Sequence, residues 1–419
     1  MRKPETIEYL YLDFDGFFAS VHQQASPKLR GKPVGVIPFE GTEYTCVIAC
    51  SKEAKARGCS NIMGYSEAKE KCPEIILVPQ NPDLYRRAHN TLIAEINTII
   101  PVEAVKSIDE ITCRLDVAQA HDPLSLAGRM KERIARYVGP YITCSIGFAP
   151  NRQLAKIAGK QNKPDGVTIW HPHDLPHALY PVPFEDIPGI GSRMERRLYK
   201  CGIYNMEQLL SVPPKHMRKI WRNVTGERLW YAFHGYAIHA QKSERGMFGH
   251  GRVLPPELRP RDHVKPIARM LLIKAARRMR KAGYYASRLY FWCNYRKGKE
   301  DRSYGDSIRL PIVNDDKACL QGLDKIWLRL CRVLSSRTRI VRIGVTLGEL
   351  SLSGCRQLDM LLNDDFERRR WERVDQAVDH LNRKYSKSLV TLGPWTPPPG
   401  GHLGGKISYT RIPRAEDFW

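Results

Sequence analysis

Carboxylates stand at the ends of two strand-like segments of the chain. One segment, S-I-D-E-I-T-C-R-L-D, contains the adjacent Asp109 and Glu110, and an N-terminal run, Y-L-Y-L-D-F-D, ends in Asp13 and Asp15. Adjacent strand residues point to opposite faces, so an ordinary half-buried strand would bury one member of the first pair. A buried carboxylate needs a metal ion or a cationic partner, and two acidic strand ends suggest a shared Mg²⁺ site. Two solvated acids before a strand are the alternative for Asp109 and Glu110 taken alone.

The bulk composition indicates a modular protein with a polyanionic partner. At 419 residues the chain is too long for one ordinary core, and roughly two to four domains are expected. Hydrophobic residues make up 42%, which argues against disorder, whereas a net charge of +23 favours nucleic acid as the partner. No long apolar segment and no secretory leader is visible, so we expect a cytoplasmic protein without a membrane partner. The 11 cysteines include no C-x-x-C pair and are predicted to be reduced.

Up to about residue 171, strand-like and helical segments alternate irregularly. Strands are expected near residues 8–13, 34–38, 44–49 and 141–148, and helices over 17–24, 84–100 and 124–137. This order indicates an α+β domain with an antiparallel or mixed sheet.

Two basic segments of this domain carry residues suited to phosphate binding. In S-K-E-A-K-A-R-G, Ser51 can cap a short helix that contains Lys52 and Lys55 directly after a strand. The segment N-R-Q-L-A-K-I-A-G-K-Q-N-K-P-D-G supplies Lys163 before a Pro-Asp-Gly turn. A helix N-terminus and several cations can bind phosphate there, and a solvated charged helix is the alternative.

Two further modules follow in the middle of the chain. The run I-P-G-I-G, with Gly189 and Gly191, precedes a helix in the helix-hairpin-helix pattern, whose main-chain N–H groups contact nucleic-acid phosphate without reading sequence. A basic helix over 265–281 then opens a small α+β module, with strands expected near 288–295, 306–311 and 340–347 and a helix over 318–334. Its residues Lys274, Arg277 and Arg278 are predicted to contact a phosphate backbone. The alternatives are a packing element without a ligand for the hairpin and solubility alone for the basic helix.

The order of these motifs resembles that of Y-family, translesion DNA polymerases of the UmuC-like and DinB-like bacterial branch. The resemblance covers residues 8 to about 350. It rests on Y-L-D-F-D-G-F-F-A-S-V at 11–21, S-I-D-E at 107–110, C-S-I-G-F-A-P-N-R-Q-L-A-K-I-A with K-P-D-G at 144–166, and I-P-G-I-G at 187–191. In the tail, before a charged helix expected over 365–384, a peptide is similar to one that binds the sliding clamp in this branch: Gln357, Leu358, Met360 and Leu361.

The resemblance implies an α+β multidomain fold with a right-hand arrangement. The palm would be residues 1–16 and 81–171, the fingers 17–80, the helical helix-hairpin-helix thumb 172–240, the α+β little finger 246–350, and the tail 351–419. It implies DNA-directed DNA synthesis past damaged bases, in DNA repair and damage tolerance. Implied partners are primed template DNA, dNTP, the sliding clamp and accessory SOS or repair subunits, in a nucleoid-associated location.

The resemblance also assigns roles to the acids. Asp13, Asp109 and Glu110 would be catalytic and would hold two Mg²⁺ ions with help from the Phe14 carbonyl. The two ions would activate the primer 3′ hydroxyl and stabilise the leaving pyrophosphate. Asp15 has no assigned metal and is a candidate for a structural role.

Nucleotide-binding residues follow from the same resemblance. Phe17 and Phe18 fall at the nucleotide site, where Phe18 matches an aromatic steric gate against the ribose 2′ hydroxyl, although plain core packing would also explain it. Lys163 matches a lysine that meets the triphosphate. Lys52 and Lys55 stand where the family usually has a Tyr and an Arg, and a lysine supplies neither a phenolic hydroxyl nor a guanidinium fork.

Two other functions stay open from the sequence. A polymerase-like scaffold would bind DNA and the clamp without catalysis; the retained acids oppose it, while Lys52 and Lys55 favour it. A metal-dependent nuclease would fit the acids and the charge but not the order of the motifs.

Overall fold

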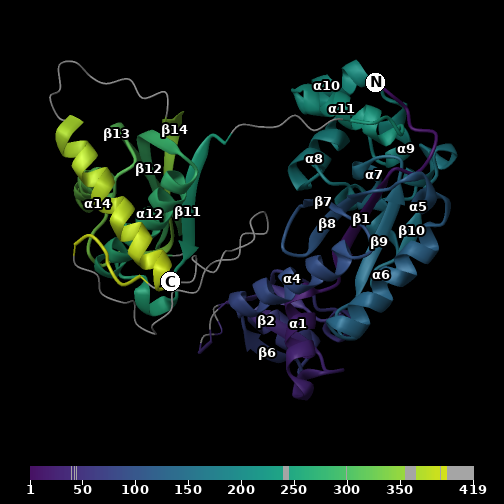
Figure 1. Ribbon diagram of the computed structural model, residues 1–419, viewed down its shortest axis with the longest axis horizontal. Coiled ribbons are helices and arrows are strands. Elements are labelled where there is room, and N and C mark those ends of the chain that lie inside the picture. Colours follow the sequence, from purple (N-terminus) through teal and green to yellow (C-terminus); the bar gives the residue numbers. More distant parts are fainter. Residues whose placement is uncertain are drawn as a thin grey trace. The chain divides into compact units, whose positions relative to one another are not determined.

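The computed structural model divides the chain into two units, and each is described by itself (Figure 1). The described residues are 1–38, 40, 41, 43, 45–238, 245–298, 300–353, 365–386 and 388–393. In these stretches no helix combines the length and the apolar character needed to cross a membrane. The cysteines that they contain are all free thiols, as predicted.

A five-stranded mixed sheet forms the centre of the first unit. Its strand order is β10-β9-β1-β8-β7, with β10 parallel to β9 and the other pairs antiparallel. The strands are β1 (Tyr9–Phe14), β7 (Val102–Val105), β8 (Glu110–Arg114), β9 (Cys144–Ala149) and β10 (Val167–Ile169). The central strand β1 therefore has β8, the acidic strand of the sequence, directly beside it.

Alternation along β1 sends its side chains to two different layers. Leu10, Leu12 and Phe14 lie in the core formed with α4 (Pro82–Asn97) and α6 (Pro123–Tyr137). The intervening positions face the other side, because successive strand side chains alternate. On that side α7 (Arg152–Gln161) packs against β9 and β1.

Two glycines let α7 approach the sheet closely. A Cβ at Gly147 of β9 would collide with the main chain of α7 at Ala155 and Gly159. The close packing fixes the position of the helix that carries Lys156 and leads to Lys163.

The described residues of 17–79 form a smaller layer next to the end of β1. A three-stranded sheet has the order β4-β2-β6, and β3 pairs with β5. The elements are α1 (Phe17–Ala25), β2 (Val34–Ile37), β3 (Cys46–Val47), β4 (Ala49–Cys50), α2 (Lys52–Ala56), β5 (Met63–Gly64), α3 (Tyr65–Lys71) and β6 (Ile76–Pro79). As predicted, the Ser51 side chain caps α2, by accepting from the N–H of Ala54.

Four short helices complete the first unit and share a core with α7. They are α8 (Ser192–Lys200), α9 (Met206–Ser211), α10 (Pro214–Trp221) and α11 (Val224–Phe233). The Asn151 amide at the start of α7 donates to the carbonyls of Ala232 (2.8 Å) and Tyr236 (3.1 Å). This buried contact ties the four helices to the sheet.

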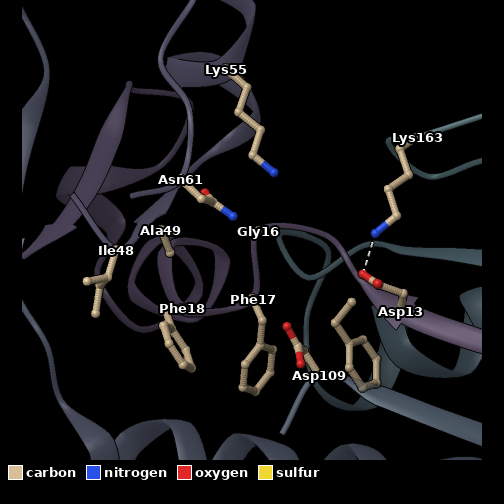
Figure 2. A pocket seen from close by; sticks show the side chains of 11 residues that line it. Asp13, Gly16, Phe17, Phe18, Ile48, Ala49, Lys55, Asn61, Asp109 and Lys163 are labelled. Carbon is tan, nitrogen blue, oxygen red and sulfur yellow. Dashed lines mark hydrogen bonds and ion pairs between the residues drawn. The ribbon is translucent and has the colours of Figure 1, made fainter. Parts of the chain in front are cut away.

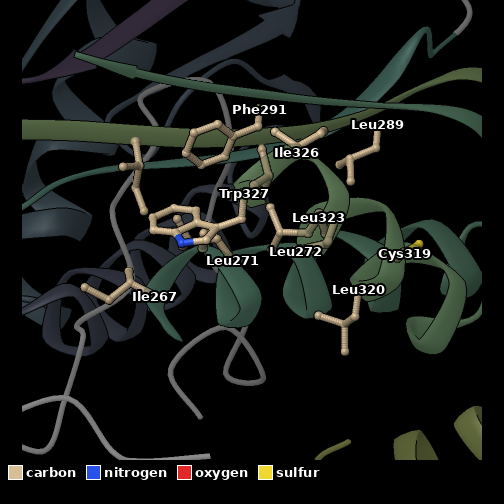
Figure 3. Packing of buried hydrophobic residues seen from close by; sticks show 14 of the residues in the cluster. Ile267, Leu271, Leu272, Leu289, Phe291, Cys319, Leu320, Leu323, Ile326 and Trp327 are labelled. Atoms are coloured by element: carbon tan, nitrogen blue, oxygen red, sulfur yellow. The ribbon is translucent and has the colours of Figure 1, made fainter. Parts of the chain in front are cut away.

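The second unit is an antiparallel sheet with helices on one face. The strand order is β11-β14-β12-β13, formed by β11 (Met247–Val253), β12 (Tyr284–Lys297), β13 (Glu300–Val313) and β14 (Arg339–Leu352). Figure 3 shows Leu289 and Phe291 of β12 packed against α12 (Arg261–Lys281) and α13 (Asp316–Val333). The Phe291 and Trp327 rings meet edge to face at 6.0 Å.

A charged helix, α14 (Asp365–Lys384), joins this unit through a buried ion cluster. Arg280 of α12 is 7% exposed and pairs with Asp316 (2.6 Å), Asp379 (2.9 Å) and Asp375 (3.6 Å). Arg277 adds a second contact to Asp379 at 3.2 Å. Burial and the neighbouring Asp316 raise the pKa of Asp375 to about 7, against the opposing effect of Arg280.

The predicted α+β class, with a mixed sheet followed by a separate sheet module, is confirmed. The sequence did not reveal β11, because M-F-G-H-G-R-V contains two glycines and no clear apolar alternation. The basic helix starts at Arg261 rather than residue 265, and Pro266 lies inside it instead of in its first turn.

Candidate active site

A cavity of about 160 Å³ opens where β1 ends, and it contains two of the predicted acids (Figure 2). Asp13 and Asp109 both line it, and so do the two cations Lys55 and Lys163. The other lining residues are Phe14, Gly16, Phe17, Phe18, Ile48, Ala49 and Asn61. Segments far apart in sequence therefore bring carboxylates and ammonium groups to one small space.

Asp13 is the last polar residue of β1 and lies opposite Glu110 in the sheet register. Its carboxylate forms an ion pair with Lys163, whose side chain is 34% exposed. Burial raises the pKa of Asp13 to about 6; Lys163 opposes this, and the charges of Asp109 and Glu110 add to it. The buried environment disfavours the ionised form of Asp13, and a bound cation would stabilise that form.

Asp109 occupies the turn that enters β8. Its main-chain carbonyl accepts from the N–H of Phe14 at 2.9 Å, which joins the turn to the end of β1. The Ser107 hydroxyl donates to its carboxylate. Burial raises the pKa of Asp109, the Ser107 hydrogen bond opposes this, and the nearby Glu110 charge raises it further.

Glu110 lies on the α7 side of the sheet rather than among the lining residues of the cavity. Lys156 of α7 donates to both of its carboxylate oxygens, at 2.7 and 2.9 Å, and the Tyr11 hydroxyl donates at 2.8 Å. Within the described residues, no three His, Cys, Asp or Glu side chains converge on a single metal position. The structure thus brings Asp13 and Asp109 together and holds Glu110 beside them through a lysine.

The donor set of the cavity fits a hard divalent cation. Two carboxylates share one cavity, and part of the raised pKa of Asp13 comes from the charge of Asp109. Carboxylate oxygens are the ligands that Mg²⁺ uses in proteins, commonly with substrate phosphates completing the set. Asp13 and Asp109 are accordingly the residues that could hold such an ion here.

The aromatic residues after β1 form one wall of the cavity. Phe17 and Phe18 are 3% and 5% exposed and begin α1. The Phe18 ring stacks on the ring of Tyr85 of α4, at 4.4 Å and an interplanar angle of 15°. The hydroxyl of Tyr85 contacts His22 Nε2 at 2.8 Å. These contacts hold the Phe18 ring in a defined orientation at the cavity.

The two lysines of α2 lie differently. Lys55 lines the cavity and points its ammonium group into it (Figure 2), whereas the exposed Lys52 is not among the lining residues. Sequence reasoning missed Asn61, whose amide also points into the cavity and whose Oδ1 accepts from the Cys50 N–H at 3.1 Å. No sequence signal singled out Asn61, because it lies in an irregular loop between α2 and β5.

The predicted DNA-binding residues lie on both units. Gly189 has φ +103°, a left-handed conformation that favours glycine, and Gly191 precedes α8 as its N-cap. On α12, the Arg278 guanidinium donates to the Gly249 carbonyl (2.6 Å), and the Lys274 carbonyl accepts from Arg278 (3.3 Å). Arg277 is bound to Asp379 and is 13% exposed. The two arginines are therefore engaged inside the second unit.

The face of the second sheet opposite α12 and α13, which no helix of the described residues covers, carries a surface that the sequence analysis missed. Tyr290 and Trp292 of β12 are 39% and 36% exposed, and Trp292 lies across Gly344 of the adjacent strand, where a Cβ would clash with it. Arg309 and Arg342 stand on the same face by register, both exposed and without an ion pair in the described part of the chain. Aromatic rings flanked by free cations suit nucleic acid.

Comparisons with known proteins agree with this architecture. Models of the impB/mucB/samB family match residues 12–160, its helix-hairpin-helix motif matches 172–203, and its C-terminal domain matches 245–360. "DNA polymerase IV" of Moorella thermoacetica is 32% identical over 394 residues, which cover 91% of this chain and 94% of the relative. The chain belongs to the Y family of DNA polymerases.

Other Y-family proteins extend the likeness to most of the chain. "DNA polymerase IV" of Bacillus velezensis is 28% identical over 91% of this chain and 92% of its own length. A solved insertion ternary complex of Dbh DNA polymerase matches with a TM-score of 0.54 and 25% identity, covering 82% of this chain and 99% of that chain. A Y-family chimera of Dbh and Dpo4 gives a TM-score of 0.66 at 24% identity, over 82% of this chain and 99% of that one. The predicted family, enzyme class and fold are confirmed.

Proposed function

We propose that this chain is a template-directed polymerase that adds deoxynucleotides to a primer opposite damaged template bases. The observation that carries the proposal is the shared cavity of Asp13 and Asp109, with Lys55 and Lys163 at its rim. Cations beside paired carboxylates suit a nucleotide triphosphate bound through a metal ion. Primed DNA and dNTP are the substrates that this arrangement would take, in support of which a solved relative is described as an insertion ternary complex.

In this proposal the acids divide the work. Asp13 and Asp109 would hold Mg²⁺ together with the Phe14 carbonyl, and Glu110, opposite Asp13 in the sheet register, would complete the site. Two bound ions would supply activation of the primer hydroxyl and charge stabilisation for the leaving pyrophosphate. Lys156 holds the Glu110 carboxylate in place through two hydrogen bonds. Lys163 neutralises Asp13 and is positioned to meet the triphosphate.

The remaining nucleotide contacts come from the first half of the chain. Lys55 is the α2 cation at the cavity, and Lys52 would serve as a second charge farther out. Phe17 and Phe18 form the wall beside the sugar, with Phe18 as the steric gate held by its stack on Tyr85. A gate held by a stacked ring can exclude a 2′ hydroxyl by contact alone.

DNA is proposed to bind to both units. The hairpin glycines Gly189 and Gly191 present main-chain N–H groups to phosphate before α8. On the second unit we propose that the sheet face with Trp292 and Arg342 contacts DNA. Lys274, which lies on α12 in the helix layer and not on this face, is proposed as a separate phosphate contact. We propose the palm at residues 1–16 and 81–171, the fingers at 17–80, the thumb at 172–240, the little finger at 246–350 and the tail at 351–419.

The clamp-binding peptide is proposed at Gln357, Leu358, Met360 and Leu361, which lie outside the described residues. The peptide precedes α14 and would recruit the sliding clamp, and accessory repair subunits are proposed as further partners. A cytoplasmic, nucleoid-associated location follows from these partners.

Incubation of a labelled primer-template with the purified protein and Mg²⁺ tests the proposal. The expected result is primer lengthening that requires dNTP and follows the template base. Shortening of the strand without dNTP would instead support a nuclease, and DNA binding with no change in length would support a scaffold. Omission of Mg²⁺ and addition of EDTA serve as the matched controls.

A further inference from the structure

Asp15 is a buried carboxylate that the cavity does not use. It is 8% exposed, lies two residues after Asp13, and is not among the residues that line the cavity. No lysine or arginine of the described part of the chain forms an ion pair with it. An isolated buried carboxylate is costly unless hydrogen bonds satisfy it. Its partners therefore show what it stabilises.

Three donors from two segments converge on the Asp15 carboxylate. The hydroxyls of Thr143 (3.1 Å) and Ser145 (2.8 Å) donate from β9 and the residue before it. The third donor is the main-chain N–H of Asp165, at 2.9 Å to Oδ2. Because Asp165 belongs to the K-P-D-G turn, the carboxylate connects the end of β1 to a segment 150 residues away.

Lys131 also contacts the K-P-D-G turn. Lys131 of α6 pairs with the Asp165 carboxylate at 2.9 Å and also donates to the Asp165 carbonyl. Asp165 has φ +59°, in the left-handed region that Asn and Asp adopt more often than most other side chains. Two residues earlier in the same turn, Lys163 reaches Asp13 at the cavity.

We propose that Asp15 is a positioning residue for Lys163. By accepting from the Asp165 N–H, it fixes the K-P-D-G turn so that the Lys163 ammonium group stands beside Asp13 and meets the triphosphate of the incoming nucleotide. The inference rests on the proposed function, in which Lys163 contacts that triphosphate. It assigns Asp15 an indirect role in nucleotide affinity and none in metal binding.

A double-mutant cycle on the KM for dNTP separates this role from simple core packing. Asp15→Ala is expected to raise KM about tenfold with a smaller change in kcat, the size expected for loss of one hydrogen bond to a charged group. Asp15→Asn keeps an oxygen that can accept from the Asp165 N–H and should restore KM to within about threefold. In a Lys163→Met background, Asp15→Ala should change KM by less than about twofold, because the residue it positions is gone.

Two further variants keep the test decisive. Lys131→Met removes the second contact to the turn, at a side chain that is 23% exposed, and should raise KM in the wild-type but not in the Lys163→Met background. Ile96→Val lowers stability in the core of the same unit without touching the turn and should leave KM unchanged.

The outcomes distinguish the inference from the proposed function. If Asp15→Ala or Lys131→Met raises KM equally in both backgrounds, or leaves it at the wild-type value, the inference is overturned. If Lys163→Met alone keeps the wild-type KM, the proposed triphosphate contact of Lys163 fails and the inference fails with it. Equilibrium dNTP binding, measured without turnover, should show the same pattern as KM.

Discussion

Acidification is expected to weaken metal binding at the cavity. Burial raises the pKa of Asp13 to about 6, so this carboxyl takes up a proton within an accessible pH range. A metal ion binds only the ionised form, and binding therefore competes with that proton. The expected direction is stronger Mg²⁺ or Mn²⁺ binding as the pH rises through 6, with no further gain well above it.

The size of the effect follows from the same pKa. With a pKa of about 6, Asp13 is about nine-tenths ionised at pH 7 and about one-tenth ionised at pH 5, so affinity should fall about tenfold between them. The raised pKa of Asp109 adds to this loss. A carboxyl with an ordinary pKa would stay ionised over the same range, and affinity would hardly change.

Mn²⁺ titration of the DNA-free protein, followed by paramagnetic relaxation of water protons, measures this affinity directly. Lys163→Met is the informative variant: Lys163 lowers the pKa of Asp13, so its removal should move the midpoint to higher pH. Lys28→Met, in an exposed turn (Pro27–Leu29) that does not line the cavity, is the charge-matched control. An affinity that stays constant from pH 7 to pH 5, or a midpoint that does not move in Lys163→Met, would refute the reasoning.

Three further predictions concern stability, DNA and sugar selection. Arg280→Met should lower the free energy of unfolding of the second unit by about 3–5 kcal/mol in chemical denaturation, because it leaves buried aspartates unpaired. Arg277 is more exposed, so Arg277→Met should lower that free energy clearly less. Equal losses in the two variants would contradict the account. Trp292→Ala should weaken DNA binding in fluorescence anisotropy by about tenfold. Leu328→Ala, which changes an exposed residue of the helix layer, should leave DNA binding unchanged. Equal effects of the two substitutions would exclude a specific role for the sheet face. Phe18→Leu should raise ribonucleotide incorporation relative to deoxynucleotide incorporation about tenfold or more, and an unchanged ratio would leave Phe18 as plain core.

Much of the fold could be predicted because its long elements carry strong periodicity. The helix over 365–384 matches α14, and the acidic strand ends correctly placed Asp13 next to the segment of Asp109 and Glu110. The strand β11 was not predicted from the sequence. The two glycines of β11 removed the alternation that marks a strand, and its pairing with β14 supplies the missing stabilisation.

The site was harder to predict because its contacts are long-range. Lys52 and Lys55 are equivalent in sequence, yet a helix of five residues turns only Lys55 toward the cavity. Arg277 looked free for phosphate until α14 brought Asp379 to it from 102 residues away. Trp292 gave no signal, because the continuous apolar run L-Y-F-W-C at 289–293 concealed which side of β12 faces solvent.

Single-turnover incorporation of one dNTP on a primed template is the most direct test of the central claim. Asp109→Ala removes a carboxylate from the cavity, and Glu103→Ala removes an exposed one from β7 of the same sheet as the matched control. The account predicts a loss of at least about a thousandfold for Asp109→Ala, the scale on which removal of an essential catalytic group acts, and a wild-type rate for Glu103→Ala. Incorporation by Asp109→Ala at the wild-type rate would contradict the claim that this cavity performs nucleotidyl transfer.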